Sequence, residues 1–166
     1  MKSRLILFFA QGLGIGRVPF APGTFGTLLG FGLLALFLWF GSWWGFAMGI
    51  LVSTLLSVWL SGKAEKILKK KDPGSVVIDE IIAIPISSIA WLAWHHDKMP
   101  GLHSVFIENW PLLLAVFVLF RFFDILKPWP VGKSQSLPGG WGVTIDDVLA
   151  GVYVNIVIVG YLLIVK

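Results

Sequence analysis

The segment FVLFRFFDILKPWP, residues 117–130, places an arginine, an aspartate and a lysine within an almost continuous apolar run. Arg121, Asp124 and Lys127 are spaced three residues apart, so in a helix they lie near one face. Pro128 disfavours helical backbone at Lys127, which predicts that the helix ends there. Charged side chains in membrane helices are rare and normally face a bundle interior or a wet cavity. The segment therefore predicts a membrane helix that ends at a polar site.

The composition of the whole chain also indicates a membrane environment. Hydrophobic residues make up 57% of the 166 positions and charged residues only 13%, and the mean hydropathy is +0.86. A soluble domain of this length cannot bury so much apolar surface. We predict an all-α fold, a polytopic transmembrane helical bundle that forms a single domain over residues 1–166. The absence of cysteine excludes disulfides and thiolate chemistry, no nucleic-acid partner is expected, and the oligomeric state stays open.

Apolar segments long enough to be membrane spans set the expected topology, since about 20 residues cross the hydrocarbon core. The candidates are 25–41, 43–60, 76–94, 106–126 and 143–165. Five spans is the preferred count, with four and six as alternatives. The first two are expected to form a helical hairpin, and Pro85 is expected to kink the third.

Basic residues near the span ends predict the orientation, because lysine and arginine gather on the cytoplasmic side. They are concentrated in the N-terminal segment, in 61–75 and in 127–142. These three segments are expected to face the cytoplasm, and 95–105 and the C-terminus to face away. The basic residues counted are Lys2, Arg4, Arg17, Lys63, Lys66, Lys69, Lys70, Lys71, Lys127 and Lys133.

Five of the nine acidic residues fall at one depth near the predicted cytoplasmic face, on three helices that are distant in sequence. They are Asp79, Glu80, Asp124, Asp146 and Asp147. Carboxylates held together repel one another, and oxygen-rich sites suit Mg²⁺. Adjacent helical residues point about 100° apart, so only one member of each acidic pair is expected to aim straight at a common ligand.

Cationic and hydroxyl side chains near these acids suit a phosphate group. Arg121, Lys127 and Arg17 supply positive charge, and Thr24 and Thr27 stand near a helix start in a glycine-rich segment. Each feature also has a purely structural interpretation: an intrahelical ion pair between Arg121 and Asp124, a helix-dipole charge at Asp146, and a flexible turn in the glycine-rich segment. These separate interpretations do not explain why the acids converge.

Four sequence blocks together resemble one family. PFAPGTFGTLLG, VVIDEIIAIP, FRFFDILKPWPVG and GGWGVTIDDVLAGVY resemble the phosphatidylglycerophosphatase A family, in the family's order and over residues 12 to about 160. The resemblance implies a Mg²⁺-dependent phosphatase of the bacterial inner membrane that converts phosphatidylglycerophosphate to phosphatidylglycerol. It implies functional roles for the five acids listed above and for Lys127, and a less defined role for Pro22, Gly23 and Thr24.

The expected reaction is metal-assisted hydrolysis of a phospholipid phosphomonoester. The predicted catalytic residues are Asp79, Asp124, Lys127 and Asp146. The predicted metal ligands are Asp79, Glu80, Asp124, Asp146 and Asp147. The predicted substrate-binding residues are Arg17, Thr24, Arg121 and Lys127. One carboxylate is expected to act as base, and attack by an aspartate itself is the alternative.

The same residues bear on other reaction mechanisms and other protein classes. His95, His96 and His103 lie in a connection predicted to face away from the acids, which disfavours a phosphohistidine mechanism. A transporter with an intramembrane acidic cation or proton site is the competing class, although the outer half of the predicted bundle offers almost no polar path. A CDP-alcohol phosphotransferase is disfavoured because its D-G-x-x-A-R signature is absent.

Overall fold

Regular structure in the described part of the chain is entirely helical. The computed structural model describes residues 2–94 and 97–165, so His95 and His96 lie outside the described residues. The chain begins with α1 (Lys2–Ala10) and a 3₁₀ segment, η1 (Gly12–Arg17). The all-α prediction is confirmed.

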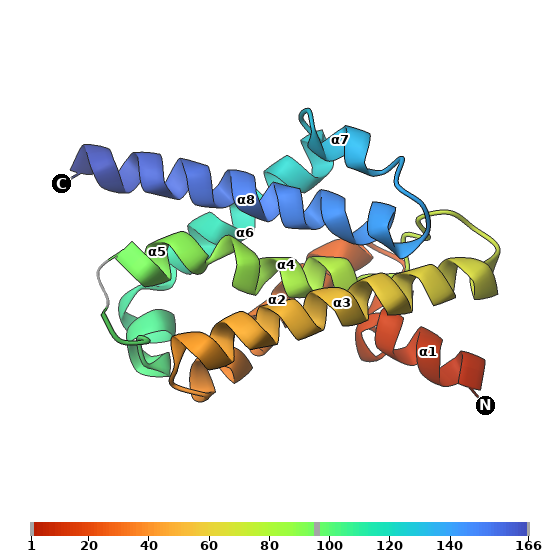
Figure 1. Cartoon of the computed structure of the whole chain (residues 1–166), viewed down its shortest axis with the longest axis horizontal. Helices are drawn as coiled ribbons and strands as arrows, with labels where there is room; N and C mark the ends of the chain where they lie inside the picture. The colour runs from red at the N-terminus through yellow and green to blue at the C-terminus, as the bar shows by residue number, and fades with distance from the viewer. Residues whose placement is uncertain (1, 95–96, 166) are drawn as a thin grey trace.

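Five helical segments run back and forth between the two ends of the molecule (Figure 1). They are α2 (Pro22–Trp39), α3 (Trp43–Leu68), the broken pair α4 (Ile78–Ser87) and α5 (Ile89–Trp94), α6 (Trp110–Leu126) and α8 (Gly140–Val165). Among the described residues, α2, α3 and α8 are long and apolar enough to cross a membrane, while the 17-residue α6 and the broken α4–α5 are shorter. The arrangement fits the predicted bundle. A short π-helix, η2 (Ser104–Glu108), precedes α6, and α7 (Val131–Ser134) lies between α6 and α8.

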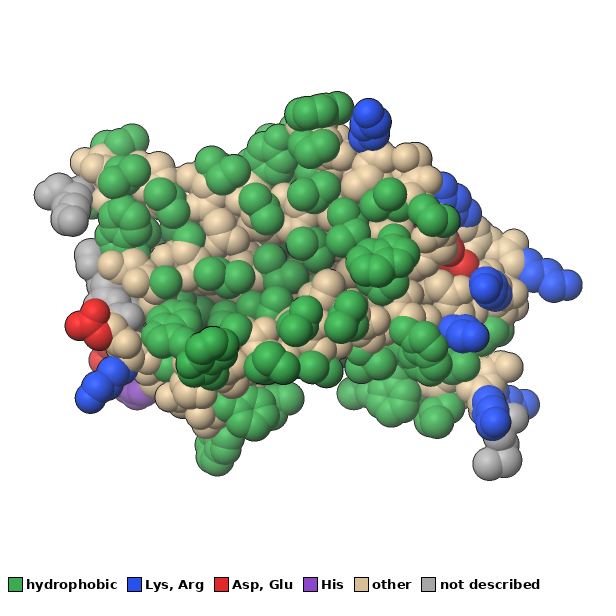
Figure 2. Space-filling model, viewed as in Figure 1, with side chains coloured by type: hydrophobic (Ala, Val, Ile, Leu, Met, Phe, Trp, Pro, Cys, Tyr) green, Lys and Arg blue, Asp and Glu red, His purple; other side chains and the backbone are tan. Residues whose placement is uncertain are grey.

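Apolar side chains cover the middle of the molecule, as a bilayer-embedded surface requires. Leu36, Leu55 and Ile156 are more than half exposed although each is strongly apolar, and Figure 2 shows such side chains along the long face. A soluble monomer rarely exposes contiguous apolar surface of this extent. Lysine and arginine side chains gather at the end where α3 ends and α8 begins.

Glycines allow α2 to lie against α4 at short range. A Cβ atom at Gly26 would stand 2.8 Å from Cβ of Val77, and one at Gly30 would stand 2.7 Å from the carbonyl oxygen of Ile81. Small residues at a membrane helix interface let two backbones approach closely. The predicted hairpin of α2 and α3 is confirmed, since only three residues separate the two helices. The Ser42 hydroxyl caps the start of α3 by accepting a hydrogen bond from Gly45 N at 3.0 Å.

The third segment is interrupted at Ser88, three residues beyond the predicted kink at Pro85. In a continuous helix the N–H of Ala90 would bond to the carbonyl of Ile86. Asn155 of α8 stands in for that bond: its Oδ1 accepts from Ala90 N at 2.7 Å, and its Nδ2 donates to Ile86 O at 2.8 Å. A side chain of a neighbouring helix thus satisfies both backbone groups that the break sets free.

Replacement of Asn155 by leucine is expected to destabilise the bundle by about 1–2 kcal/mol, because both backbone groups at the break lose their partner and interhelical bonds in membranes have about this magnitude. Thermal unfolding of the purified protein in detergent measures the effect. The matched control is Ile156→Leu, since Ile156 is 60% exposed on the same helix. Equal unfolding temperatures for the two variants would contradict this role of Asn155.

Candidate active site

The first turn of α4 carries two of the predicted acids, Asp79 and Glu80. Its start is fixed by Val77, which is fully buried and whose N–H donates to the carbonyl of Ala10 at 3.0 Å. Negative charge is favourable at a helix N-terminus because the free N–H groups carry partial positive charge. The contact with α1 therefore sets the depth at which both acids stand.

The second turn of α8 carries Asp146 and Asp147, which are both buried. Close packing on α3 positions this turn: a Cβ at Gly140 would collide with the carbonyl oxygen of Val58. One turn further on, the hydroxyls of Ser57 and Thr144 are hydrogen-bonded at 3.0 Å. The glycine-rich start of α8 is therefore needed for its approach to α3.

Three carboxylates from these two helices converge. Asp79, Glu80 and Asp147 each place one oxygen within 4.8 Å of the others. Oδ1 of Asp79, Oε2 of Glu80 and Oδ2 of Asp147 are buried and lack a hydrogen-bond partner. Unpaired buried carboxylate oxygens are expensive unless a cation compensates them. The three acids form what we term the acidic triad.

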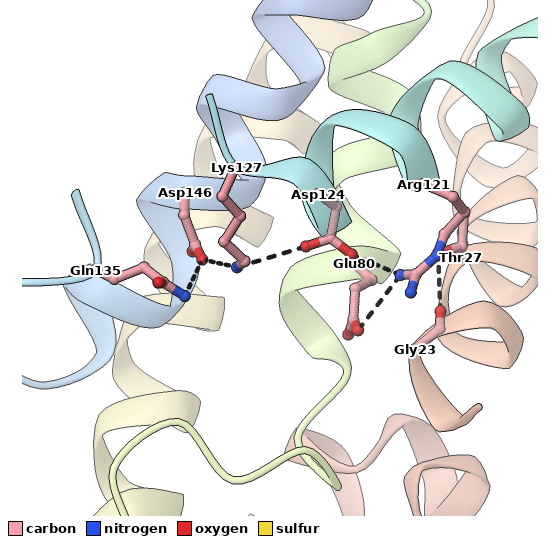
Figure 3. Close-up of polar contacts among 8 residues, drawn as sticks. All are labelled: Gly23, Thr27, Glu80, Arg121, Asp124, Lys127, Gln135 and Asp146. Carbon is pink, nitrogen blue, oxygen red and sulfur yellow. Dashed lines mark hydrogen bonds and ion pairs between the residues drawn. The ribbon is translucent and has the colours of Figure 1, made fainter. Parts of the chain in front are cut away.

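A chain of ion pairs extends from the triad across α6 (Figure 3). Nη1 of Arg121 lies 3.8 Å from Oε1 of Glu80 and 2.7 Å from Oδ2 of Asp124. Nζ of Lys127 lies 3.6 Å from the other oxygen of Asp124. The predicted end of this helix is confirmed, because α6 stops at Leu126 and Lys127 caps it in a left-handed conformation.

Asp146 is held by α6 and by the segment before α8. Its Oδ2 accepts from Lys127 Nζ and, at 3.0 Å, from Nε2 of Gln135, while its Oδ1 is buried without a partner. Gln135 was not predicted, since a lone glutamine in a polar connection carries no sequence signal. Tyr153 was also missed; its hydroxyl donates to Trp129 O at 2.8 Å and fixes the loop after α6.

The predicted metal-ligand residues thus divide into two groups. Asp79, Glu80 and Asp147 form the triad, whereas Asp124 and Asp146 lie beside it and bond to Arg121 and Lys127. For the pair on α8, only Asp147 aims at the triad, as expected. On α4 both Asp79 and Glu80 contribute an oxygen; the extra methylene of glutamate extends its reach around the helix, so Glu80 can approach from the side.

The predicted substrate-binding residues on the glycine-rich segment lie apart from these contacts. Thr27 is fully buried and donates to Gly23 O at 2.8 Å, which makes it a structural residue of α2. Thr24 is half-buried in the first turn of α2. Arg17 is exposed, and its Nε donates to Oε1 of Gln11 at 2.7 Å; among the described residues it has no hydrogen bond or ion pair with the triad. Gly23 faces Glu80 and Arg121.

The donor set of the triad fits a hard divalent cation. All three side chains offer oxygen atoms, and Mg²⁺ and similar ions select oxygen ligands. One oxygen of each side chain lies within 4.8 Å of the others, and each side chain also has a buried oxygen without a hydrogen-bond partner. Two cationic side chains, Arg121 and Lys127, lie beside these acids.

A helical membrane protein with a buried acidic triad and adjacent cations has the elements of an integral-membrane phosphatase. The family model described as phosphatidylglycerophosphatase A matches residues 8–162. The chain belongs to this family, and it is an enzyme of the phosphoric monoester hydrolase class.

Relatives match along almost the whole chain. A Haemophilus influenzae protein named phosphatidylglycerophosphatase A is 36% identical, covering 92% of this chain and 86% of its own length. The Escherichia coli K12 protein of the same name is 33% identical, covering 91% and 83%. A Bacteroides thetaiotaomicron protein named "Putative phosphatidylinositol-3-phosphatase" is 36% identical, covering 94% and 92%. No solved structure gives a significant match.

Replacement of Gly23 by alanine is expected to lower activity at least tenfold, because the new Cβ would collide with Oε1 of Glu80 and stand 3.0 Å from Nη1 of Arg121. Both atoms are at the ends of flexible side chains, so the collision displaces the Glu80 carboxylate and the Arg121 guanidinium from the site. Phosphate release by purified protein measures the effect. Gly32→Ala is the matched control on the same helix, since a Cβ there meets nothing within 4 Å. Full activity of Gly23→Ala would contradict the close contact of α2 with the site.

Proposed function

We propose that the protein is a Mg²⁺-dependent phosphatidylglycerophosphate phosphatase that acts on the cytoplasmic leaflet of a bacterial inner membrane. The observation that carries the proposal is the acidic triad, in which three buried carboxylate oxygens from two helices lack any protein partner. The products would be phosphatidylglycerol and inorganic phosphate. Family membership and two relatives with this name support the substrate.

The position of the site supports action at a membrane surface. The triad lies near the starts of α4 and α8, at the end of the molecule where lysine and arginine side chains gather (Figure 2). Basic residues favour the cytoplasmic side of a membrane. A phospholipid headgroup in that leaflet would present its terminal phosphate to this end of the bundle.

Asp79, Glu80 and Asp147 would hold the metal ion. Bound there, Mg²⁺ would supply positive charge to the phosphoryl oxygens and lower the pKa of a bound water. The packing of Gly140 on α3 and the bond between Val77 and Ala10 keep the three carboxylates in place against their mutual repulsion.

Two cationic side chains would bind the phosphate. Arg121 on α6 and Lys127 at the C-terminal cap of α6 both bond to Asp124, which holds them beside the triad and Asp146. Positioned donors stabilise charge that develops on phosphoryl oxygens more strongly than mobile water does, because they need no reorganisation. Asp124 is therefore proposed as a positioning residue.

Asp146 would act as the general base. One of its oxygens is held by Lys127 and Gln135, whereas Oδ1 is buried and free to accept a proton. The attacking water would give a proton to Oδ1 as its oxygen bonds to phosphorus. The bond between phosphorus and the glycerol oxygen would break, and that oxygen would take up the proton from Oδ1 and leave as a hydroxyl, which restores the carboxylate.

The direct test is phosphate release from phosphatidylglycerophosphate by the purified protein in detergent, with Mg²⁺ and with excess EDTA. Release is expected only with Mg²⁺, and phosphatidylinositol 3-phosphate in a parallel reaction tests the activity named for the Bacteroides relative. Unchanged release in EDTA would refute metal dependence. Faster release from the inositol lipid would move the proposal to that substrate.

Replacement of Asp147 by asparagine is expected to weaken metal binding more than tenfold, since the triad loses a charged ligand. Even groups that only hydrogen-bond to a metal ligand contribute about 10- to 100-fold to metal affinity. Mn²⁺ serves as the probe, and its electron paramagnetic resonance signal reports bound metal without turnover. Asp97→Asn removes the same charge from an exposed connection and is expected to bind Mn²⁺ as the unmodified protein does. Equal affinities in both variants would exclude the triad as the metal site.

Replacement of Lys127 by glutamine is expected to lower kcat about 10²- to 10³-fold, because a positioned cation is lost at the phosphoryl oxygens. Steady-state kinetics at saturating Mg²⁺ measure the effect, and Mn²⁺ binding is expected to persist because Lys127 is not a ligand. Lys133→Gln is the control, since Lys133 is exposed just beyond the same loop. A kcat that remains unchanged in Lys127→Gln would remove this lysine from the chemistry.

A further inference from the structure

We propose that a groove between α1 and η1, outside the acidic triad, binds the headgroup and upper acyl chain of an anionic phospholipid. The groove has a volume of about 750 Å³. Its lining consists of Lys2, Arg4, Leu5, Phe8 and Arg17. The inference does not depend on hydrolysis, because it concerns binding at a different place on the chain.

The charge of the groove selects an anion. Three of its five lining residues are basic and none is acidic. A second groove, of about 440 Å³, lies between the end of α3 and residues 136–139; it contains four lysines but also Glu65, and its hydrophobic residues are Leu137 and Pro138. The α1 groove therefore combines unopposed positive charge with a distinct apolar part.

The apolar part of the groove selects a lipid over a soluble anion. Leu5 is 59% exposed and Phe8 42% exposed, although both are large hydrophobic residues. A free phosphate ion gains nothing from these side chains, whereas an acyl chain buries them. With nine residues α1 is too short to cross a bilayer, and a short basic and apolar helix of this kind lies at the membrane surface.

Arg17 is already oriented for phosphate binding. Its Nε donates to Gln11, and Nε2 of the buried Gln11 side chain donates in turn to Ser75 Oγ at 3.1 Å. Among the described residues, the two terminal nitrogens of Arg17 have no hydrogen-bond or ion-pair partner. A guanidinium held on one side presents its remaining donors in the planar arrangement that matches phosphate oxygens.

The test uses the absence of cysteine from the chain. A fluorophore is attached at Ser3→Cys, on α1 beside the groove, or at Leu163→Cys, near the end of α8. Each protein is placed in phosphatidylcholine nanodiscs with a small fraction of either phosphatidylglycerol or phosphatidylcholine that carries a nitroxide on its acyl chain. Phosphatidylglycerol contains a phosphodiester, so a phosphomonoesterase does not consume the probe. The measured quantity is the ratio of quenching by the two lipids.

The ratio is expected to exceed one at Ser3→Cys and to be near one at Leu163→Cys. The combined change Lys2→Gln, Arg4→Gln and Arg17→Gln should bring it to one, since each basic residue near an anionic surface contributes about fivefold. Lys69→Gln, Lys70→Gln and Lys71→Gln together remove the same charge from the second groove and should leave the ratio unchanged. If the triple variant fails to fold, Arg4→Gln alone is used, since Arg4 is exposed. This single change is expected to lower the ratio at Ser3→Cys.

Three results would overturn the proposal. A ratio near one at Ser3→Cys would show no preference for the anionic lipid. An equal loss in the second-groove variant would indicate a general surface potential in place of a site. Loss of the preference on addition of inorganic phosphate, with Phe8→Ser having no effect, would identify a free anion as the ligand.

Discussion

Electrostatic repulsion among three buried carboxylates is the constraint on which the rest of this structure depends. Two unit charges 4 Å apart repel by about 4 kcal/mol at an effective dielectric constant of 20, and Asp79, Glu80 and Asp147 approach one another at about this range. The helices that carry them must therefore be held from outside the site. Glycine contacts fix α2 on α4 and α8 on α3, and the amide of Asn155 joins α8 to the break after α4.

Sequence reasoning succeeded where the physical signal was local or compositional. Apolar segments with basic flanks predicted the helical bundle, and Pro128 predicted the end of the helix at Lys127. The convergence of acids from three helices was also predictable, because all lie at one depth. Asn155 and Gln135 could not be found in this way, since their roles depend on which backbone group or carboxylate a folded neighbour brings to them. The sharing of the triad by both Asp79 and Glu80 depends on side-chain length, which helical angles alone do not describe.

The acids and cations of the site are concentrated at one end of the bundle, whereas the core contacts between the helices are apolar. The core that unites α2, α4, α6 and α8 consists of residues such as Leu34, Ile84, Val116 and Val154. Packing of these residues stabilises the bundle without placing charge in the hydrocarbon region. The charged groups then need only one wet interface, and the ion-pair chain from Glu80 to Asp146 runs across it (Figure 3).

The left-handed conformation of Lys127 sets stability and activity against each other at a single position. Its φ of 47° lies in a region that glycine adopts freely and that costs a lysine roughly 1–2 kcal/mol. The same conformation ends α6 where the ammonium group can reach Asp124 and Asp146. Under the proposed mechanism, selection for a more stable fold would favour glycine here and selection for phosphate chemistry would retain the lysine, so the enzyme would trade stability for activity at this helix end.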